Sequence, residues 1–199
     1  MRCFVIMPYG NLSENPERKR DLDLFYHELI KPAVESVPLP GTVGEYVKCH
    51  RADKEPRPGE IVMHIIENLV LSEIAIADVT GRNPNVFYEL GVRHAVSDNT
   101  ILLAQGEEDI PMDLRGQRYF IYRRDFQGGV RLRDALVRAV EEIVRSPKKI
   151  DNPVCSINSK RGSRTRGHFR VTTPFKNCCS KCPTFGRILK RNSVRSNHC

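Results

Sequence analysis

The chain has 199 residues, and 32 Lys and Arg against 24 Asp and Glu give it a formal net charge of +8. This length suits one domain with a substantial core and a short appendage rather than two domains. The sequence has no run of about 18 uncharged apolar residues, and its N-terminal stretch reaches Pro8 and Gly10 too early for a signal peptide. We therefore expect a cytoplasmic protein with no membrane partner.

The residues up to 150 alternate between short apolar runs and amphipathic stretches, which is typical of an α/β fold. Strands are predicted at residues 3–7, 45–50, 73–78, 100–104 and 118–122. Helices are predicted at residues 22–37, 60–73, 84–97 and 130–146. The longest irregular connection, residues 105–117, is either a lid over a site or a solvated loop.

The positive charge is concentrated at the end of the chain. Residues 1–150 hold 21 Lys and Arg against 23 Asp and Glu, whereas residues 151–199 hold 11 against 1. The last segment is also rich in Ser, Asn and Gly and has little periodicity, which predicts a domain over 1–148 and a disordered, basic, Cys-containing tail over 149–199. The tail either contacts nucleic acid through phosphates or is a functionless solvated extension, and the second is the preferred interpretation.

The seven cysteines are expected to be reduced, because their number is odd and no secretory signal is present. The "CCSKC" stretch in the tail has one C-x-x-C pair and no second pair at good spacing, so no metal site is predicted.

Polar residues follow the first three predicted strands. In a parallel sheet the carboxyl ends of the strands meet at one rim, where ligands bind. This rule brings together the residues after the first strand (Pro8, Tyr9, Gly10), the stretch from Arg51 to Asp53 after the second, and the stretch from Asp78 to Asn85 after the third. Tyr9 is alternatively an ordinary aromatic side chain at the sheet edge.

The helix after the third strand has clear start signals, with Asn83 as N-cap and Pro84 at the first position. Its free backbone N–H groups suit an anion such as a phosphate. Glu89 either forms a surface ion pair with Arg93, four residues on, or looks over the rim. Asp78 either caps the following turn or belongs to a site. Gly91 and His94 are expected to serve helix packing.

Three stretches carry a resemblance to a known family: "FVIMPYG", "IADVTGRNPNVFYELGVRHA" and "PMDLRGQRYFIYRRD". Together they resemble the nucleoside 2-deoxyribosyltransferase-like superfamily, and within it a bacterial group described as nucleotide-binding and similar to toll/interleukin-receptor domains. The resemblance covers about residues 1–145. With the element order, it predicts a flavodoxin-like three-layer α/β domain with a five-stranded, mostly parallel sheet.

The resemblance implies chemistry at the N-glycosidic bond of a nucleoside or nucleotide, as a hydrolase or 2-deoxyribosyltransferase without a cofactor. It makes Glu89 the nucleophile, Asp78 a sugar ligand or an aid to proton transfer, and Tyr9 the residue that orients the nucleophile. The predicted substrate-binding residues are Pro8, Gly10, Asp53, Gly81, Asn83 and Asn85. The family also suggests a homo-oligomer in which a neighbouring subunit completes the site.

One position departs from the family pattern, because many of the transferases carry an Asp where this chain has Asn83. An amide cannot shuttle a proton, so a second hypothesis stays open: a non-catalytic nucleotide-binding sensor module that signals by self-association. Arg51, Arg82 and Arg93 near the predicted rim either suit a phosphate or are solvated. No P-loop, G-x-S-x-G or G-x-G-x-x-G motif supports another class of site.

Overall fold

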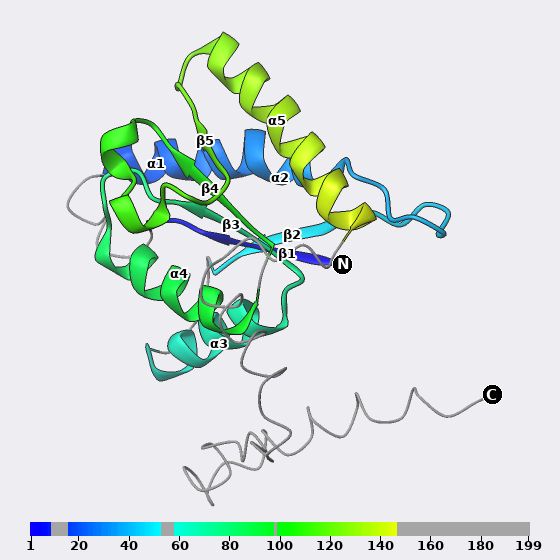
Figure 1. Cartoon of the computed structure of the whole chain (residues 1–199), viewed down its shortest axis with the longest axis horizontal. Coiled ribbons are helices and arrows are strands. Elements are labelled where there is room, and N and C mark those ends of the chain that lie inside the picture. The colour runs from blue at the N-terminus through cyan, green and yellow to red at the C-terminus, as the bar shows by residue number, and fades with distance from the viewer. Residues whose placement is uncertain (9–15, 53–57, 98, 147–199) are drawn as a thin grey trace, which may run out of the picture. The chain divides into compact units, whose positions relative to one another are not determined.

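The computed structural model describes residues 1–8, 16–52, 58–97 and 99–146 (Figure 1). Among the predicted site residues, Tyr9, Gly10 and Asp53 lie outside the described residues. The predicted tail and the domain boundary at residue 148 also lie outside them.

Five strands form one sheet, and all four pairings between them are parallel. The strands are β1 (Arg2–Ile6), β2 (Lys48–Arg51), β3 (Ile74–Asp78), β4 (Thr100–Ala104) and β5 (Tyr119–Ile121). Their spatial order is β2-β1-β3-β4-β5. This is the strand order of flavodoxin-like folds, which confirms the predicted fold class. Every residue of β3 and β4 is buried, as expected for central strands covered on both faces.

Helices cover both faces of the sheet, which gives three layers (Figure 1). The first helical stretch is continuous and consists of α1 (Pro16–Leu24), a π-helical segment η2 (Phe25–Ile30) and α2 (Lys31–Glu35). The other long helices are α3 (Pro58–Leu71), α4 (Pro84–Val96) and α5 (Phe126–Arg145). Two short 3-10 turns, η3 (Glu107–Asp109) and η4 (Met112–Leu114), lie in the long connection after β4.

The sheet separates two hydrophobic cores. On one face, side chains of the first helical stretch and α5 pack against alternate strand residues such as Val5 and Ile76. On the other face, α3 and α4 pack against the intervening residues, such as Phe4 and Ala75. This alternation follows from the two-residue period of a strand. The sheet is therefore packed on both faces, and the loops at its carboxyl edge begin where these buried strands end.

The packing predictions for two residues of α4 have different outcomes. His94 is buried, as expected. Gly91 is exposed, and a Cβ atom built there would have no other heavy atom within 4 Å outside the local helix backbone. The prediction that Gly91 serves helix packing was therefore wrong.

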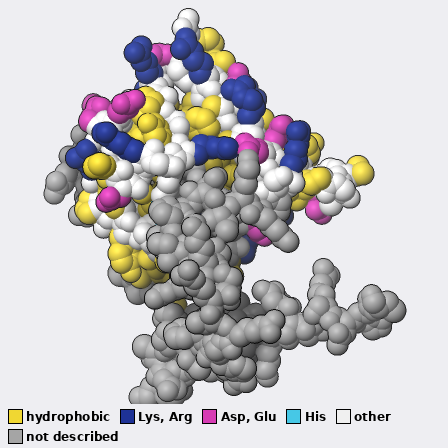
Figure 2. Space-filling model, viewed as in Figure 1, with side chains coloured by type: hydrophobic (Ala, Val, Ile, Leu, Met, Phe, Trp, Pro, Cys, Tyr) yellow, Lys and Arg dark blue, Asp and Glu magenta, His cyan; other side chains and the backbone are white. Residues whose placement is uncertain are grey.

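Some apolar side chains remain on the surface. Val62, Met63 and Val70 of α3 are about half exposed, and Figure 2 shows apolar side chains gathered at this side of the molecule. Within the described part of the chain, no helix combines the length and apolar character needed to cross a membrane. Cys3 and Cys49 are buried and form no disulfide with each other, and they lie opposite each other on β1 and β2.

Candidate functional site

Asp78 is the last residue of β3 and lies at the carboxyl edge of the sheet. Its side chain is almost fully enclosed, at 1% exposure. One oxygen, Oδ1, accepts a hydrogen bond from the backbone N–H of Thr80 (3.1 Å), and the other, Oδ2, accepts one from the hydroxyl of Tyr122 (2.8 Å). The turn-capping role considered for Asp78 is therefore present, and it occupies only one of the two oxygens.

Burial raises the pKa of the Asp78 carboxyl above its ordinary value, because desolvation disfavours the charged form. The two bonds from Thr80 and the bond from Tyr122 oppose this shift, as does the positive charge of Arg124. A buried carboxyl under such opposing influences is sensitive to the loss of a single donor.

Tyr122 follows β5 directly and is 2% exposed. Besides donating to Asp78, its hydroxyl accepts a hydrogen bond from Nε2 of Gln105 (3.3 Å) and lies 3.5 Å from Oγ1 of Thr80. Burial, together with the charge of Asp78, raises the pKa of Tyr122 to about 12. The phenol is therefore protonated at neutral pH and serves as a hydrogen-bond donor.

The π-helical segment supports this tyrosine from the side. The ring of Phe25 stacks on the ring of Tyr122, with centroids 4.7 Å apart, and the guanidinium of Arg124 lies 5.4 Å from the Phe25 ring centre. The next residue, Tyr26, also points inward, and its hydroxyl donates to the carbonyl of Cys49 (3.4 Å). The wide turn of a π-helix lets two consecutive aromatic side chains reach the interior, and such turns occur often at functional sites.

The loop after β4 is bonded to the loop after β3. Asp109 accepts hydrogen bonds from the backbone N–H groups of Gly81 (2.9 Å) and Gly106 (3.3 Å), and the guanidinium of Arg82 donates to the carbonyl of Glu108. Gly81 and Arg82 both have positive φ, at 73° and 53°, so this turn is tight. The connection at 105–117 thus packs on the rim. The N–H of Gly81, which was predicted to contact substrate, already has a partner in Asp109.

The start of α4 is built as predicted. Asn83 has extended backbone angles and its side chain accepts a hydrogen bond from the N–H of Asn85 (2.9 Å), with Pro84 in the first turn. Its amide oxygen is therefore used as an N-cap. Asn85 is exposed and Asn83 is half-buried.

Glu89 lies in the second turn of α4, half-buried. Within the part of the chain that the structure describes, its carboxylate has no hydrogen-bond or salt-bridge partner. Burial alone raises the pKa of Glu89 to about 7. A carboxyl that is shielded from water without any compensating donor is unusual outside functional sites.

Arg93 does not form the expected ion pair with Glu89. It is fully buried, and its guanidinium donates to the carbonyls of Leu69 (2.8 Å) and Ser72 (2.6 Å) at the end of α3 and to that of Glu73 (3.2 Å). The interpretation of Glu89 and Arg93 as a surface ion pair was wrong, because this face of α4 lies against α3 rather than against solvent.

The arginines suggested for phosphate binding have structural partners instead. The side chain of Arg51 is buried, forms an ion pair with Asp23 at 2.5 Å, and has its guanidinium 4.6 Å from the centre of the Tyr26 ring. Arg82 bonds the neighbouring loop, and Arg93 bonds the end of α3. At the start of α4, Pro84 has no backbone N–H, and the N–H groups of Asn85 and Phe87 bond to Asn83.

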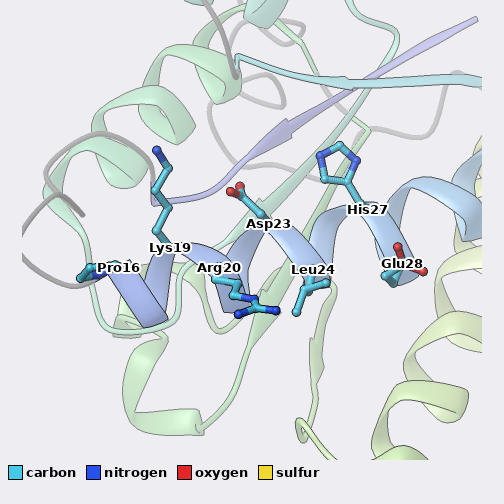
Figure 3. Close-up of a pocket in the computed structure, with 7 residues that line it drawn as sticks. All are labelled: Pro16, Lys19, Arg20, Asp23, Leu24, His27 and Glu28. Carbon is cyan, nitrogen blue, oxygen red and sulfur yellow. The ribbon is translucent and has the colours of Figure 1, made fainter.

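A surface pocket of about 450 Å³ lies along α1 and η2 (Figure 3). Lys19, Asp23 and His27 point to one side of the helix, and Arg20 and Leu24 point to the other. Neither Asp78 nor Glu89 lines this pocket. We place the candidate site at the carboxyl edge of the sheet, because the two carboxyl groups with raised pKa values lie on β3 and α4.

The structure brings Asp78 together with residues that the sequence analysis did not single out: Thr80, Gln105 and Tyr122. No described hydrogen bond joins Asp78 to Glu89, and Pro8 is buried after β1. The rule of strand ends would have found Gln105 and Tyr122, because they follow the fourth and fifth strands.

Comparison with models of known protein families found no match, and comparison with curated proteins found none.

Proposed function

We propose that the protein cleaves or transfers the N-glycosidic bond of a nucleoside or nucleotide, with Glu89 as the nucleophile. The observation that carries this proposal is the carboxylate of Glu89, which is half-buried and has no partner among the described residues. A structural glutamate at such a place would normally have a donor. A nucleophile needs an unoccupied carboxylate that faces substrate.

The chemistry follows from two carboxyl groups in different surroundings. Glu89 attacks the anomeric carbon, the bond to the base breaks, and the electron pair of that bond leaves with the base. Water or an acceptor base then displaces Glu89 from the sugar. Asp78, held by Thr80 and Tyr122, delivers the proton that the departing base needs or binds the sugar hydroxyls.

The partial burial of Glu89 favours this role. A poorly hydrated carboxylate is a stronger nucleophile than one in bulk water, and its pKa of about 7 leaves a substantial ionised fraction at neutral pH. The exposed side chain of Asn85, in the first turn of α4, carries an amide that can hydrogen-bond a phosphate or a sugar oxygen. These features fit a nucleoside or its monophosphate.

A nucleotide sensor without turnover is the second candidate. What favours it is Asn83, whose side chain is used as a helix cap and cannot transfer a proton. Both oxygens of Asp78 also have partners within the protein. A module with this arrangement would bind a nucleotide, leave it intact and signal through self-association.

The test is chromatographic. The full chain is incubated with deoxynucleosides, nucleosides, their monophosphates and NAD, and the released base is quantified. Glu89→Gln is compared with Glu67→Gln, which changes a half-buried glutamate on the neighbouring helix α3. We expect base release by the wild type and by Glu67→Gln, and at least an approximately hundredfold loss in Glu89→Gln.

Equal base release by the wild type and Glu89→Gln would contradict the nucleophile assignment. The sensor hypothesis would be supported by a different pattern, in which no base appears but one nucleotide raises the melting temperature saturably and stays intact.

A further inference from the structure

Within the described residues, the hydroxyl of Tyr122 has three hydrogen-bond partners at the carboxyl edge of the sheet, Asp78, Gln105 and the more distant Thr80. It donates to Oδ2 of Asp78 at 2.8 Å and accepts from Nε2 of Gln105 at 3.3 Å. Asp78, Gln105 and Tyr122 follow or end three neighbouring strands, β3, β4 and β5. The hydroxyl is thus the point at which three loops at the rim are connected.

The ring of Tyr122 has a separate support. Phe25 stacks on its face with an interplanar angle of 16°. A phenylalanine at position 122 would keep this stacking and fill the same space. Packing therefore does not account for the hydroxyl. Burying a hydroxyl costs desolvation free energy, and hydrogen bonds to its partners offset that cost.

The partner that needs the hydroxyl is Asp78. Its Oδ1 accepts from the backbone N–H of Thr80, which orients one end of the carboxyl group, and the side chain of Thr80 also favours the ionised form. The bond from Tyr122 to Oδ2 fixes the other end, so the plane of the carboxyl group is determined. Among the residues that the structure describes, two charged or titratable groups act on Asp78. The hydrogen bond from Tyr122 and the positive charge of Arg124 both favour the ionised form of its carboxyl group.

We propose that Tyr122 is a positioning residue that holds the Asp78 carboxyl group in the orientation needed for proton transfer to the departing base. This role rests on the proposed function. Gln105 acts on Asp78 through Tyr122, because its side-chain amide donates to the Tyr122 hydroxyl. Its backbone N–H donates to Oγ1 of Thr80 (3.1 Å).

The experiment compares Tyr122→Phe with Tyr119→Phe in the full chain. Tyr119 is a tyrosine of the same strand region, partly buried and packed against the core on the opposite face, and no described hydrogen bond involves its hydroxyl. The Asp78 carboxyl is followed by ¹³C NMR through a pH titration and assigned with Asp78→Asn. The values of kcat and KM for base release are measured over the same pH range.

We expect Tyr122→Phe to move the titration of Asp78 to higher pH, because a donor to the ionised form is lost. We also expect kcat to fall roughly tenfold or more with KM unchanged, and the Asp78 limb of the pH profile to move with the NMR titration. Tyr119→Phe should match the wild type in both. Gln105→Leu, at an exposed position, should shift both in the same direction by a smaller amount.

A folded Tyr122→Phe protein with a wild-type Asp78 titration would overturn the positioning role. So would an unchanged kcat and pH profile despite a shifted titration. If the wild type releases no base from any substrate while the titration of Asp78 still shifts in Tyr122→Phe, the proposed function fails and the hold of Tyr122 on Asp78 stands. Should Tyr122→Phe not fold, the titration and kcat of Gln105→Leu decide by the same criteria.

Discussion

The guanidinium of Arg93 in α4 donates a hydrogen bond of 2.8 Å to the carbonyl of Leu69 in α3. A second bond from the same Nη1 atom reaches Ser72, just beyond the last residue of α3. Carbonyls at the end of a helix have no intrahelical partner and need a donor from elsewhere. Arg93 thus joins the two helices on one face of the sheet, and Glu89 is left without the ion pair that its spacing suggested.

Replacing Arg93 with methionine should lower the free energy of unfolding by about 2 to 4 kcal/mol, because buried hydrogen bonds from a charged group are lost at the end of α3. The measurement is urea denaturation followed by circular dichroism. Arg93→Lys keeps a positive charge and should recover part of the loss. If Arg93→Met were as stable as the wild type, the joining role of Arg93 would be wrong.

Glu89→Gln should make the fold more stable at pH 8 than the wild type. The folded pKa of about 7 lies above the ordinary value of 4.5, so both states are protonated below about pH 4.5 and no penalty exists there. As pH rises from 4.5 through 7, the unfolded state ionises more readily and stability is lost, up to roughly 2 to 3 kcal/mol. Denaturation at pH 4 and pH 8 checks this. Stability gains of equal size at both pH values would refute the ionisation argument.

The activity of the wild type should show the opposite trend with pH. A carboxylate nucleophile must be ionised, so kcat/KM for base release should rise as pH increases through about 7, and any fall at higher pH belongs to the loss of the Asp78 proton. The rate is measured with one substrate at low concentration between pH 5 and 9. A rate that falls with pH across 7 would indicate that Glu89 acts as a proton donor instead.

Two glycines near the site should respond oppositely to alanine. Gly91 lies in the helix interior with open space around it, so Gly91→Ala should raise the free energy of unfolding by about 0.5 to 1 kcal/mol. Gly81 has a φ of 73°, so Gly81→Ala should lower it by about 1 kcal/mol. Thermal unfolding of both variants provides the comparison. Destabilisation by Gly91→Ala would show that the open space around position 91 is needed.

The apolar patterns were sufficient to predict the sheet. The run at 100–104 coincides with β4 at both ends, because a central parallel strand is buried on both faces and reads as a continuous apolar segment. The first helix was predicted to start at residue 22, but α1 begins at Pro16. Its first turns are highly polar and bury only Leu22, so they have no apolar stripe to detect.

The candidate site was predictable only in part. Glu89 and Asp78 follow from the resemblance and from the strand-end rule, whereas spacing alone could not show which face of α4 meets α3. The stacking of Phe25 on Tyr122 joins residues 97 positions apart, and no local pattern indicates such a contact. The pairing of Asp109 with Gly81 likewise depends on the path of a loop that has no periodicity.

The π-helical segment Phe25–Ile30 changes which side of the helix the residues of α1 face relative to those of α2. Each residue of an α-helix turns the chain by about 100°, so a wide turn that takes up an extra residue rotates everything before it relative to everything after it. Ala33 and Val34 of α2 are buried, and Asp23 at the end of α1 reaches Arg51 of β2. Deleting one residue from the segment would restore a uniform pitch and turn Asp23 away from Arg51. The direction in which the polar side chains of α1 point is therefore determined by the π-helical segment that follows α1, and not by α1 alone.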